Sequence, residues 1–81
     1  MGRVVVEVMP KPEILDPQGR AIDAALAEKG HDRLRAVRQG KRFELEVDGE
    51  VTDADLELAR KVAEEVLANT VVEDVVKVEA L

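Results

Sequence analysis

The sequence predicts a single α+β domain over residues 1–81 with the ferredoxin-like order βαββαβ, in which a four-stranded antiparallel sheet carries two helices on one face. Three observations lead to this fold class. Valine-rich segments open and close the chain, two stretches with helical spacing of apolar residues lie between them, and a strictly alternating segment occupies the middle. A chain of 81 residues has room for one domain with a modest core.

The first predicted strand covers residues 3–9, RVVVEVM. Its β-branched residues favour extended backbone, and Val4, Val6 and Val8 fall on one face because side chains alternate along a strand. Pro10 ends the strand, since proline donates no hydrogen bond to a sheet.

The first predicted helix runs from residue 17 to Lys29. Asp16 is placed as its N-cap, Pro17 fits the first helical position because that position needs no backbone N–H, and Gly30 supplies a left-handed stop. Its apolar stripe consists of Ala21, Ile22, Ala25 and Leu26. We expect this stripe to be buried against the sheet.

Two strands are predicted in the middle of the chain, one around residues 36–38 and one over KRFELEV, residues 41–47, joined by a turn at Gln39 and Gly40. In the second strand, Phe43, Leu45 and Val47 alternate with Arg42, Glu44 and Glu46. Such alternation is typical of a sheet that is covered on one side only.

A second helix is predicted over residues 53–68, where Thr52 and Asp55 resemble a capping box and Asn69 is a left-handed cap. Its apolar stripe consists of Leu56, Ala59, Val62, Ala63, Val66 and Leu67. The last strand lies in VVEDVVKVEAL, and Val76, Val78 and Ala80 are expected on the covered face.

The uncovered face of this sheet is predicted to mix charged and apolar side chains. It would carry Arg3, Glu7, Arg42, Glu44, Glu46, Lys77 and Glu79 together with Val5, Met9 and Val75. This mixture is too apolar for a fully solvated face and too charged for a core, so we expect part of it to contact another copy.

Composition excludes several classes of function. A net charge of −6 and a pI near 4.7 disfavour nucleic acid, and Phe43 is the only aromatic residue available for stacking. The absence of cysteine excludes a thiol nucleophile, disulfides and a cysteine-based zinc site. No apolar run approaches the roughly 20 residues that span a bilayer, so we expect a cytoplasmic protein without membrane contact.

The residues also offer little catalytic equipment. His31 is the only histidine and lacks companions for a triad or a histidine-rich metal site, so a solvated loop residue is the better interpretation. The carboxylates, such as Glu44 and Glu46, fall where water-facing positions are predicted. We therefore expect no catalytic residue, no metal ligand and no cofactor on this chain.

Two short stretches leave alternatives open. In DPQGR, Gly19 and Arg20 either bring the backbone close to a phosphate or simply start a helix, and Asp16 at the cap favours the second interpretation because it would repel an anion. In VRQGKR, residues 37–42, the basic side chains around Gly40 either dock an acidic partner or a phosphate, or belong to an ordinary charged hairpin.

The motifs DPQG at residues 16–19, VRQGK at 37–41 and LAN at 67–69, taken in this order and spacing, resemble the PurS family, the small subunit of phosphoribosylformylglycinamidine (FGAM) synthase. The resemblance spans nearly the whole chain. Thr70 departs from the proline that often follows LAN in the family, whereas Glu73 keeps the family-like acid.

The resemblance implies a non-catalytic subunit of a glutamine-dependent, ATP-consuming ligase in de novo purine biosynthesis. In that complex a large synthetase subunit (PurL) uses ATP, magnesium and formylglycinamide ribonucleotide, and a glutaminase subunit (PurQ) releases ammonia. The small subunit forms a homodimer or higher homo-oligomer, bridges the two larger subunits and supports ammonia transfer. No cofactor is implied on the small subunit itself.

Six residues in or directly next to these motifs are candidate partner contacts: Gln18, Gly19, Arg20, Arg38, Lys41 and Asn69. A glycine inside a helix costs up to about 1 kcal/mol relative to alanine, which favours a close-approach role for Gly19. Other classes of function remain open. The first is a stand-alone ACT-like regulatory domain that binds a small metabolite, and less favoured ones are an RNA-binding module and an independent small enzyme.

Overall fold

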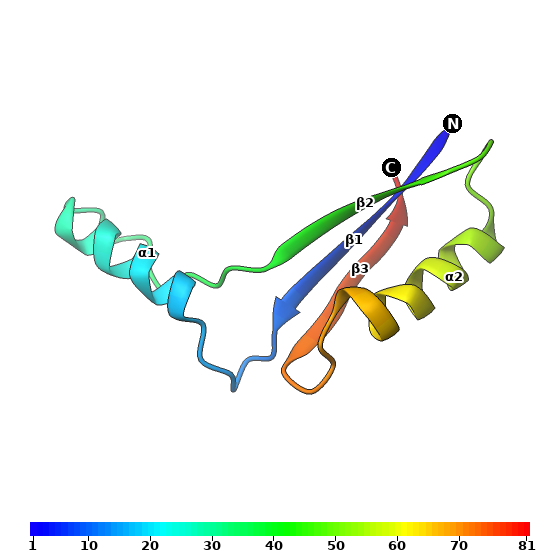
Figure 1. The fold of residues 1–81 in the computed structure, drawn as a ribbon. Coiled ribbons are helices and arrows are strands. Elements are labelled where there is room, and N and C mark those ends of the chain that lie inside the picture. The colour runs from blue at the N-terminus through cyan, green and yellow to red at the C-terminus, as the bar shows by residue number, and fades with distance from the viewer.

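The structure is a computed structural model that describes residues 1–81. Its elements are β1 (Gly2–Pro10), α1 (Pro17–Glu28), β2 (Lys41–Val47), α2 (Asp53–Val62), the π-helical segment η1 (Ala63–Leu67) and β3 (Glu73–Ala80). The strands form one antiparallel sheet in the order β2-β1-β3, so β1 is the central strand (Figure 1). The predicted α+β class is confirmed.

The predicted fourth strand is wrong, because residues 36–38 pair with no other strand and the sheet has three. Ala36 adopts a positive φ of 57°, which interrupts an extended segment. Two backbone N–H groups that follow Ala36 donate to carboxylates of α1 and its N-cap: Val37 N–H to Asp23 Oδ1 at 3.0 Å and Gln39 N–H to Asp16 Oδ2 at 2.6 Å. Side chains thus occupy the donors that a strand would have used.

The chain divides into two regions, which we call the arm (residues 13–39) and the body (residues 1–12 and 40–81). Figure 1 shows α1 extending beyond the end of the sheet, while α2 alone lies across it. The prediction that two helices cover one face is therefore wrong. The radius of gyration is 15.8 Å, whereas a compact chain of this length has about 12 Å, so the molecule is elongated.

The core is a thin layer between β1 and α2. Val4, Val6 and Val8 of β1 are at most 1% exposed, as their alternation predicts. They pack against the small side chains Ala59, Ala63 and Ala68. Burial of each valine side chain contributes about 2 kcal/mol to the free energy of unfolding.

A bulge in β3 changes which valines face this core. The register with β1 shifts between Glu7, opposite Lys77, and Val8, opposite Val75. Val75 therefore packs against the core and Val76 is 55% exposed, the reverse of the predicted arrangement.

On the opposite face of the sheet, charged side chains from the three strands pair with one another. Glu7 lies within 4.0 Å of both Arg42 and Lys77, and Arg3 reaches Glu44 at 3.5 Å and Glu46 at 3.6 Å. The predicted charged face is confirmed. Val5 lies among these residues along the sheet and is only 2% exposed.

The second helix begins as predicted and ends differently. Thr52 and Asp55 form the expected capping box, with each side chain accepting the other residue's N–H. The π-helical turn then brings Ala68 into the core and leaves Val66 72% exposed. Asn69 is not a left-handed cap, because Ala68 already leaves the helix in extended conformation and Ala36 is the only non-glycine residue with positive φ. Neither helix has the length and apolar composition to cross a membrane.

Candidate partner-contact sites

The entrance of α1 is organised by the carboxylate of Asp16, which is only 5% exposed. Its Oδ1 accepts the N–H of Gly19 at 3.0 Å, which confirms Asp16 as the N-cap. Its Oδ2 accepts the N–H of Gln39 at 2.6 Å, across 23 residues of sequence. One side chain thus starts the helix and fixes the segment that returns from it.

Gly19 allows these two segments to approach each other. A Cβ atom at this position would overlap the carbonyl oxygen of Val37 and the carboxylate of Asp16. The predicted close approach therefore exists within the chain itself. Gly19 is buried, so it shapes the surface through its neighbours.

Two more candidate residues complete this junction. The Arg38 guanidinium donates to the carbonyl oxygens of Lys11 at 2.8 Å and Ile14 at 3.1 Å, and the Gln39 side-chain amide donates to Gln18 Oε1 at 2.9 Å. We call the group Asp16, Gln18, Gly19, Arg38 and Gln39 the arm joint. Arg20 lies beside it, is exposed and forms no ion pair.

The remaining candidates gather at a second carboxylate, Glu73, at the start of β3. Lys41 Nζ lies 3.0 Å from Glu73 Oε2, and the N–H of Asn69 donates to Glu73 Oε1 at 2.8 Å. The Asn69 side chain accepts the N–H of Val71 at 3.2 Å, which shapes the loop between η1 and β3. The structure thus brings Lys41 and Asn69 together at a site separate from the arm joint.

Electrostatics keep both carboxylates ionised. The N–H groups of Gln39 and Gly19 lower the pKa of Asp16, and the Asn69 N–H followed by the Lys41 ammonium lowers the pKa of Glu73. Next to them, a hydrogen bond to Asp74 at 2.6 Å raises the pKa of Lys11. Asp16 and Glu73 thus accept backbone N–H groups, whereas Lys11 pairs with the side chain of Asp74.

Two elements of these sites were missed by sequence reasoning. The first is Gln39, which bonds to both Asp16 and Gln18, and the second is the role of Glu73 as an acceptor for Lys41 and Asn69. The sequence did carry a signal for Gln39, because the motifs DPQG and VRQG each place a glutamine beside a glycine. His31 lies exposed near the tip of the arm, and no group of three or more His, Asp or Glu side chains in the structure is arranged to hold a metal ion.

Comparison with known proteins gives one consistent result. The family model for PurS, phosphoribosylformylglycinamidine (FGAM) synthase, matches residues 3–80. The FGAM synthase subunit PurS of Mycobacterium leprae is 57% identical over 74 residues, which are 91% of this chain and 90% of that protein.

Solved structures agree with this match. PurS of Bacillus subtilis is 38% identical with a TM-score of 0.81 over 100% of this chain and 99% of that one. A chain of the PurLQS structure from Thermotoga maritima is 31% identical with a TM-score of 0.84 over 99% of this chain and 96% of that one. The chain therefore belongs to the PurS family and is an FGAM synthase subunit of purine biosynthesis.

Proposed function

We propose that this chain is the non-catalytic small subunit that joins the synthetase subunit (PurL) and the glutaminase subunit (PurQ) of FGAM synthase and supports ammonia transfer between them. The observation that carries the proposal is the likeness along 99% of the chain to a chain of the PurLQS structure from Thermotoga maritima. In this assignment ATP and magnesium are used by the synthetase subunit, and the complex works in the cytoplasm.

The geometry supports a scaffold role. The carboxylates with a perturbed pKa, Asp16 and Glu73, accept hydrogen bonds from their own chain and hold loops in place. The arm joint and the Glu73 site are two ordered groups of polar residues near the end of the sheet where β1 ends and β2 and β3 begin. A bridge between two larger subunits needs surfaces of this kind.

Self-association is part of the proposal. The chain exposes 5986 Å² of surface, whereas a compact monomer of its mass exposes about 4,800 Å². An excess of roughly 1,200 Å² compares with the roughly 800 Å² that each partner buries in a standard interface. A homodimer or a higher homo-oligomer would cover this surface.

The six candidate residues divide into two roles in this proposal. Gln18 and Arg20 present polar groups at the surface of α1 and are direct contacts for a larger subunit. Gly19, Arg38, Lys41 and Asn69 act through the loops that they hold.

Reconstitution tests the assignment. Purified chain is mixed with synthetase and glutaminase subunits, and glutamine-dependent formation of formylglycinamidine ribonucleotide is measured beside the ammonia-dependent reaction of the synthetase alone. We expect the glutamine-dependent rate to require this chain and the ammonia-dependent rate to be independent of it. Equal glutamine-dependent rates without the chain would contradict the proposal, and saturable binding of an amino acid or nucleotide by the isolated chain would favour the ACT-like alternative.

The contact residue Arg20 is tested in the same assay. Arg20→Glu should weaken association with a larger subunit, with a smaller effect at high salt, because the substitution reverses an exposed charge. Lys29→Glu is the matched control, since it makes the same charge change at the other end of α1. Equal association of the two variants would remove Arg20 from the contact surface.

A further inference from the structure

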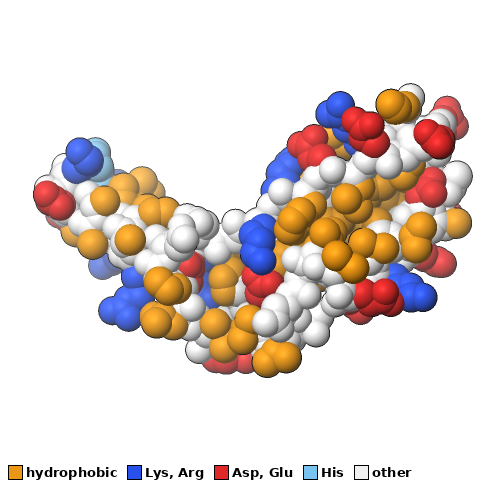
Figure 2. All heavy atoms as spheres, viewed as in Figure 1, with side chains coloured by type: hydrophobic (Ala, Val, Ile, Leu, Met, Phe, Trp, Pro, Cys, Tyr) orange, Lys and Arg blue, Asp and Glu red, His pale blue; other side chains and the backbone are white.

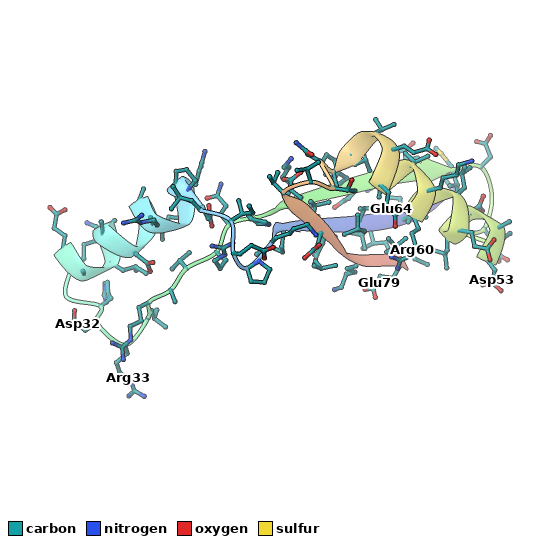
Figure 3. The ribbon with its side chains drawn as sticks, turned by 90° about the horizontal axis from the view of Figure 1, so that it is seen from below. Asp32, Arg33, Asp53, Arg60, Glu64 and Glu79 are labelled. Carbon is teal, nitrogen blue, oxygen red and sulfur yellow. The ribbon has the colours of Figure 1, made fainter.

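The arm is attached to the body at few points. Figure 2 shows a hollow in the surface between the two regions, and Figure 3 shows Asp32 at the tip of the arm, far from Arg60 on α2. No ion pair joins the arm to the body. Two hydrogen bonds do, and both end on the carbonyl oxygen of Lys11, which accepts the N–H of Ile14 at 2.9 Å and the Arg38 guanidinium at 2.8 Å.

Lys11 is held on the body by two bonds of its own. Its N–H donates to the carbonyl oxygen of Val72 at 2.9 Å, and its Nζ lies 2.6 Å from Oδ1 of Asp74. The Lys11 side chain is 28% exposed, less than any other basic side chain in an ion pair, so water screens this pair less than the surface pairs. Lys11 is therefore fixed to the residues on either side of Glu73 at the start of β3.

The backbone around Lys11 is stiff. It lies between Pro10 and Pro12, whose rings restrict φ, and a residue that precedes proline is restricted to extended conformations. Pro10 is the last residue of β1 and lies opposite Glu73 in the sheet. The body thus fixes the direction in which the Lys11 carbonyl oxygen points.

Other polar contacts do not replace this attachment. The side chains of Asp16 and Gln18 bond to Gln39 and Gly19, which all belong to the arm. These bonds hold the arm together as one piece, but they do not set its angle to the sheet, beyond which α1 extends (Figure 1). The link through Lys11 is the contact that sets this angle.

We propose that Lys11 is a positioning residue that fixes the arm to the body and so holds two groups of candidate contacts at a set spacing. These groups are the exposed surface of α1 and the loop that Glu73 organises. Lys11 bonds beside both, to Arg38 of the arm joint through its carbonyl oxygen and to Asp74 through its ammonium. The inference rests on the proposed bridging function and names the residue on which the geometry of the bridge depends.

A rigid attachment matters for a subunit that contacts two partners. Binding of the first partner presents the second contact surface at a high effective concentration only if the geometry allows both contacts at once. If the arm pivots, only a fraction of the chains has the productive direction, and the apparent affinity falls by that fraction. The loss then appears in the assembly of all three subunits and not in the binding of the chain to either larger subunit alone.

Two substitutions test this distinction. Lys11→Met and Arg38→Met each remove the charged group and keep an unbranched stem. The variant chain is titrated into fixed concentrations of synthetase and glutaminase, and glutamine-dependent formation of formylglycinamidine ribonucleotide is followed. We expect the chain concentration at half-maximal rate to rise about 10-fold, while the affinity for each larger subunit alone changes by less than about twofold.

Lys77→Met and Arg35→Met are the matched controls. Lys77 pairs with carboxylates on the charged face of the sheet, and Arg35 is an exposed residue of the arm without an ion pair. Both variants should keep the half-maximal concentration within about twofold of wild type. Lys11→Arg retains a cation within reach of Asp74 and should restore most of the assembly.

Spin labels measure the direction of the arm within one chain. They are attached to Asp32→Cys at the tip of the arm and to Arg60→Cys on α2, since the chain has no cysteine of its own. Labelled chains are diluted with excess unlabelled chain, so that only distances within a chain are recorded. We expect one narrow distance distribution, which becomes at least about twofold wider with Lys11→Met or Arg38→Met and stays narrow in the controls.

Several outcomes would overturn the inference. One is a distance distribution that stays narrow in both variants, and another is an assembly that needs no more of the variants than of the controls. A loss of affinity for one larger subunit alone would make Lys11 or Arg38 a direct contact instead. If circular dichroism shows that Lys11→Met does not fold, Asp74→Asn removes the same ion pair from its other side and must give the same result.

The failure of this inference is distinguishable from that of the proposed function. Equal behaviour of variants and controls, with a retained requirement for the chain in glutamine-dependent synthesis, would remove Lys11 as a positioning residue and leave the subunit assignment. A wild-type chain that adds nothing to glutamine-dependent synthesis would contradict the proposed function, and the label distances would still report whether Lys11 holds the arm.

Discussion

The arm and the body are held together by different interactions. Of the nine buried residues, the seven in the body are valines and alanines, and the two in the arm are Asp16 and Gly19. The body is therefore stabilised by a hydrophobic layer, and the arm is positioned by hydrogen bonds to one carboxylate. Burial of apolar area is non-directional, whereas hydrogen bonds fix geometry. The body supplies stability, and the arm joint supplies an orientation.

The hydrophobic layer should give the largest effect. Val6→Ala removes two methyl groups from a side chain that is fully buried, so we expect the free energy of unfolding to fall by about 2 kcal/mol. Val76→Ala, at a 55% exposed position, should change it by no more than about 0.5 kcal/mol. Urea unfolding followed by circular dichroism measures both, and similar losses would show that the β3 bulge does not separate inner from outer valines.

Gly19→Ala tests the arm joint, because helix propensity and the close approach at Gly19 predict opposite effects on stability. Helix propensity alone predicts a gain of about 1 kcal/mol for this substitution. The overlap with the Val37 carbonyl predicts instead that the return segment moves away and the Asp16–Gln39 hydrogen bond weakens. We expect faster amide exchange at Gln39 with little change in the amides of β1, whereas a stabilised protein with protected Gln39 would contradict the close approach.

Acid should open the arm joint. The folded state lowers the pKa of Asp16, so the ionised carboxylate stabilises the arm joint fully above about pH 4. This stabilisation is lost as the pH falls through the lowered pKa. The amide resonances of Gly19 and Gln39 should move together in that range. Asp16→Asn should abolish the coupled shift, and its persistence in this variant would assign the transition to another group.

The smallest effect is expected from the charged face of the sheet. Arg3→Ala breaks exposed ion pairs with Glu44 and Glu46 and should change the free energy of unfolding by no more than about 0.5 kcal/mol. The difference from wild type should vanish in 1 M salt. A larger loss that survives salt would mean that the Arg3 stem, by covering Val5, contributes through apolar contact.

Features encoded by neighbouring residues could be predicted from the sequence. The Asp16 cap, the capping box of Thr52 and Asp55, and the alternation of Val4, Val6 and Val8 all appear where the pattern places them. Each depends on spacing within one turn or one strand, so local rules suffice.

Features decided by contacts distant in the sequence could not be predicted. Residues 36–38 have a composition suited to a strand, but Asp16 and Asp23 compete for the backbone donors around them. The bulge that exchanges Val75 and Val76 arises from pairing with β1. The apolar stripe of α1 predicts a helix packed on the sheet, but Ala21, Ile22 and Ala25 of that stripe are exposed, so this prediction is wrong for the single chain.

Of the candidate contacts, the sequence motifs located the arm joint but not its organisation. Gln18, Gly19 and Arg38 were selected as groups facing a partner, and the structure gives Gly19 and Arg38 partners within the chain. The bond from Gln39 to Asp16 spans 23 residues and has no local periodicity that would reveal it.

Three buried alanines between α2 and the end of η1 affect more than the packing of the core. Ala59, Ala63 and Ala68 let the helical segment approach β1 closely, and Ala59 also lines the apolar groove that Leu45 of β2 forms with Leu58 and Val62 of α2. Enlarging Ala63, which has no exposed surface, would lift the helix and widen that groove. A side chain larger than a methyl group at Ala63 would therefore change both the core and the shape of the neighbouring apolar surface.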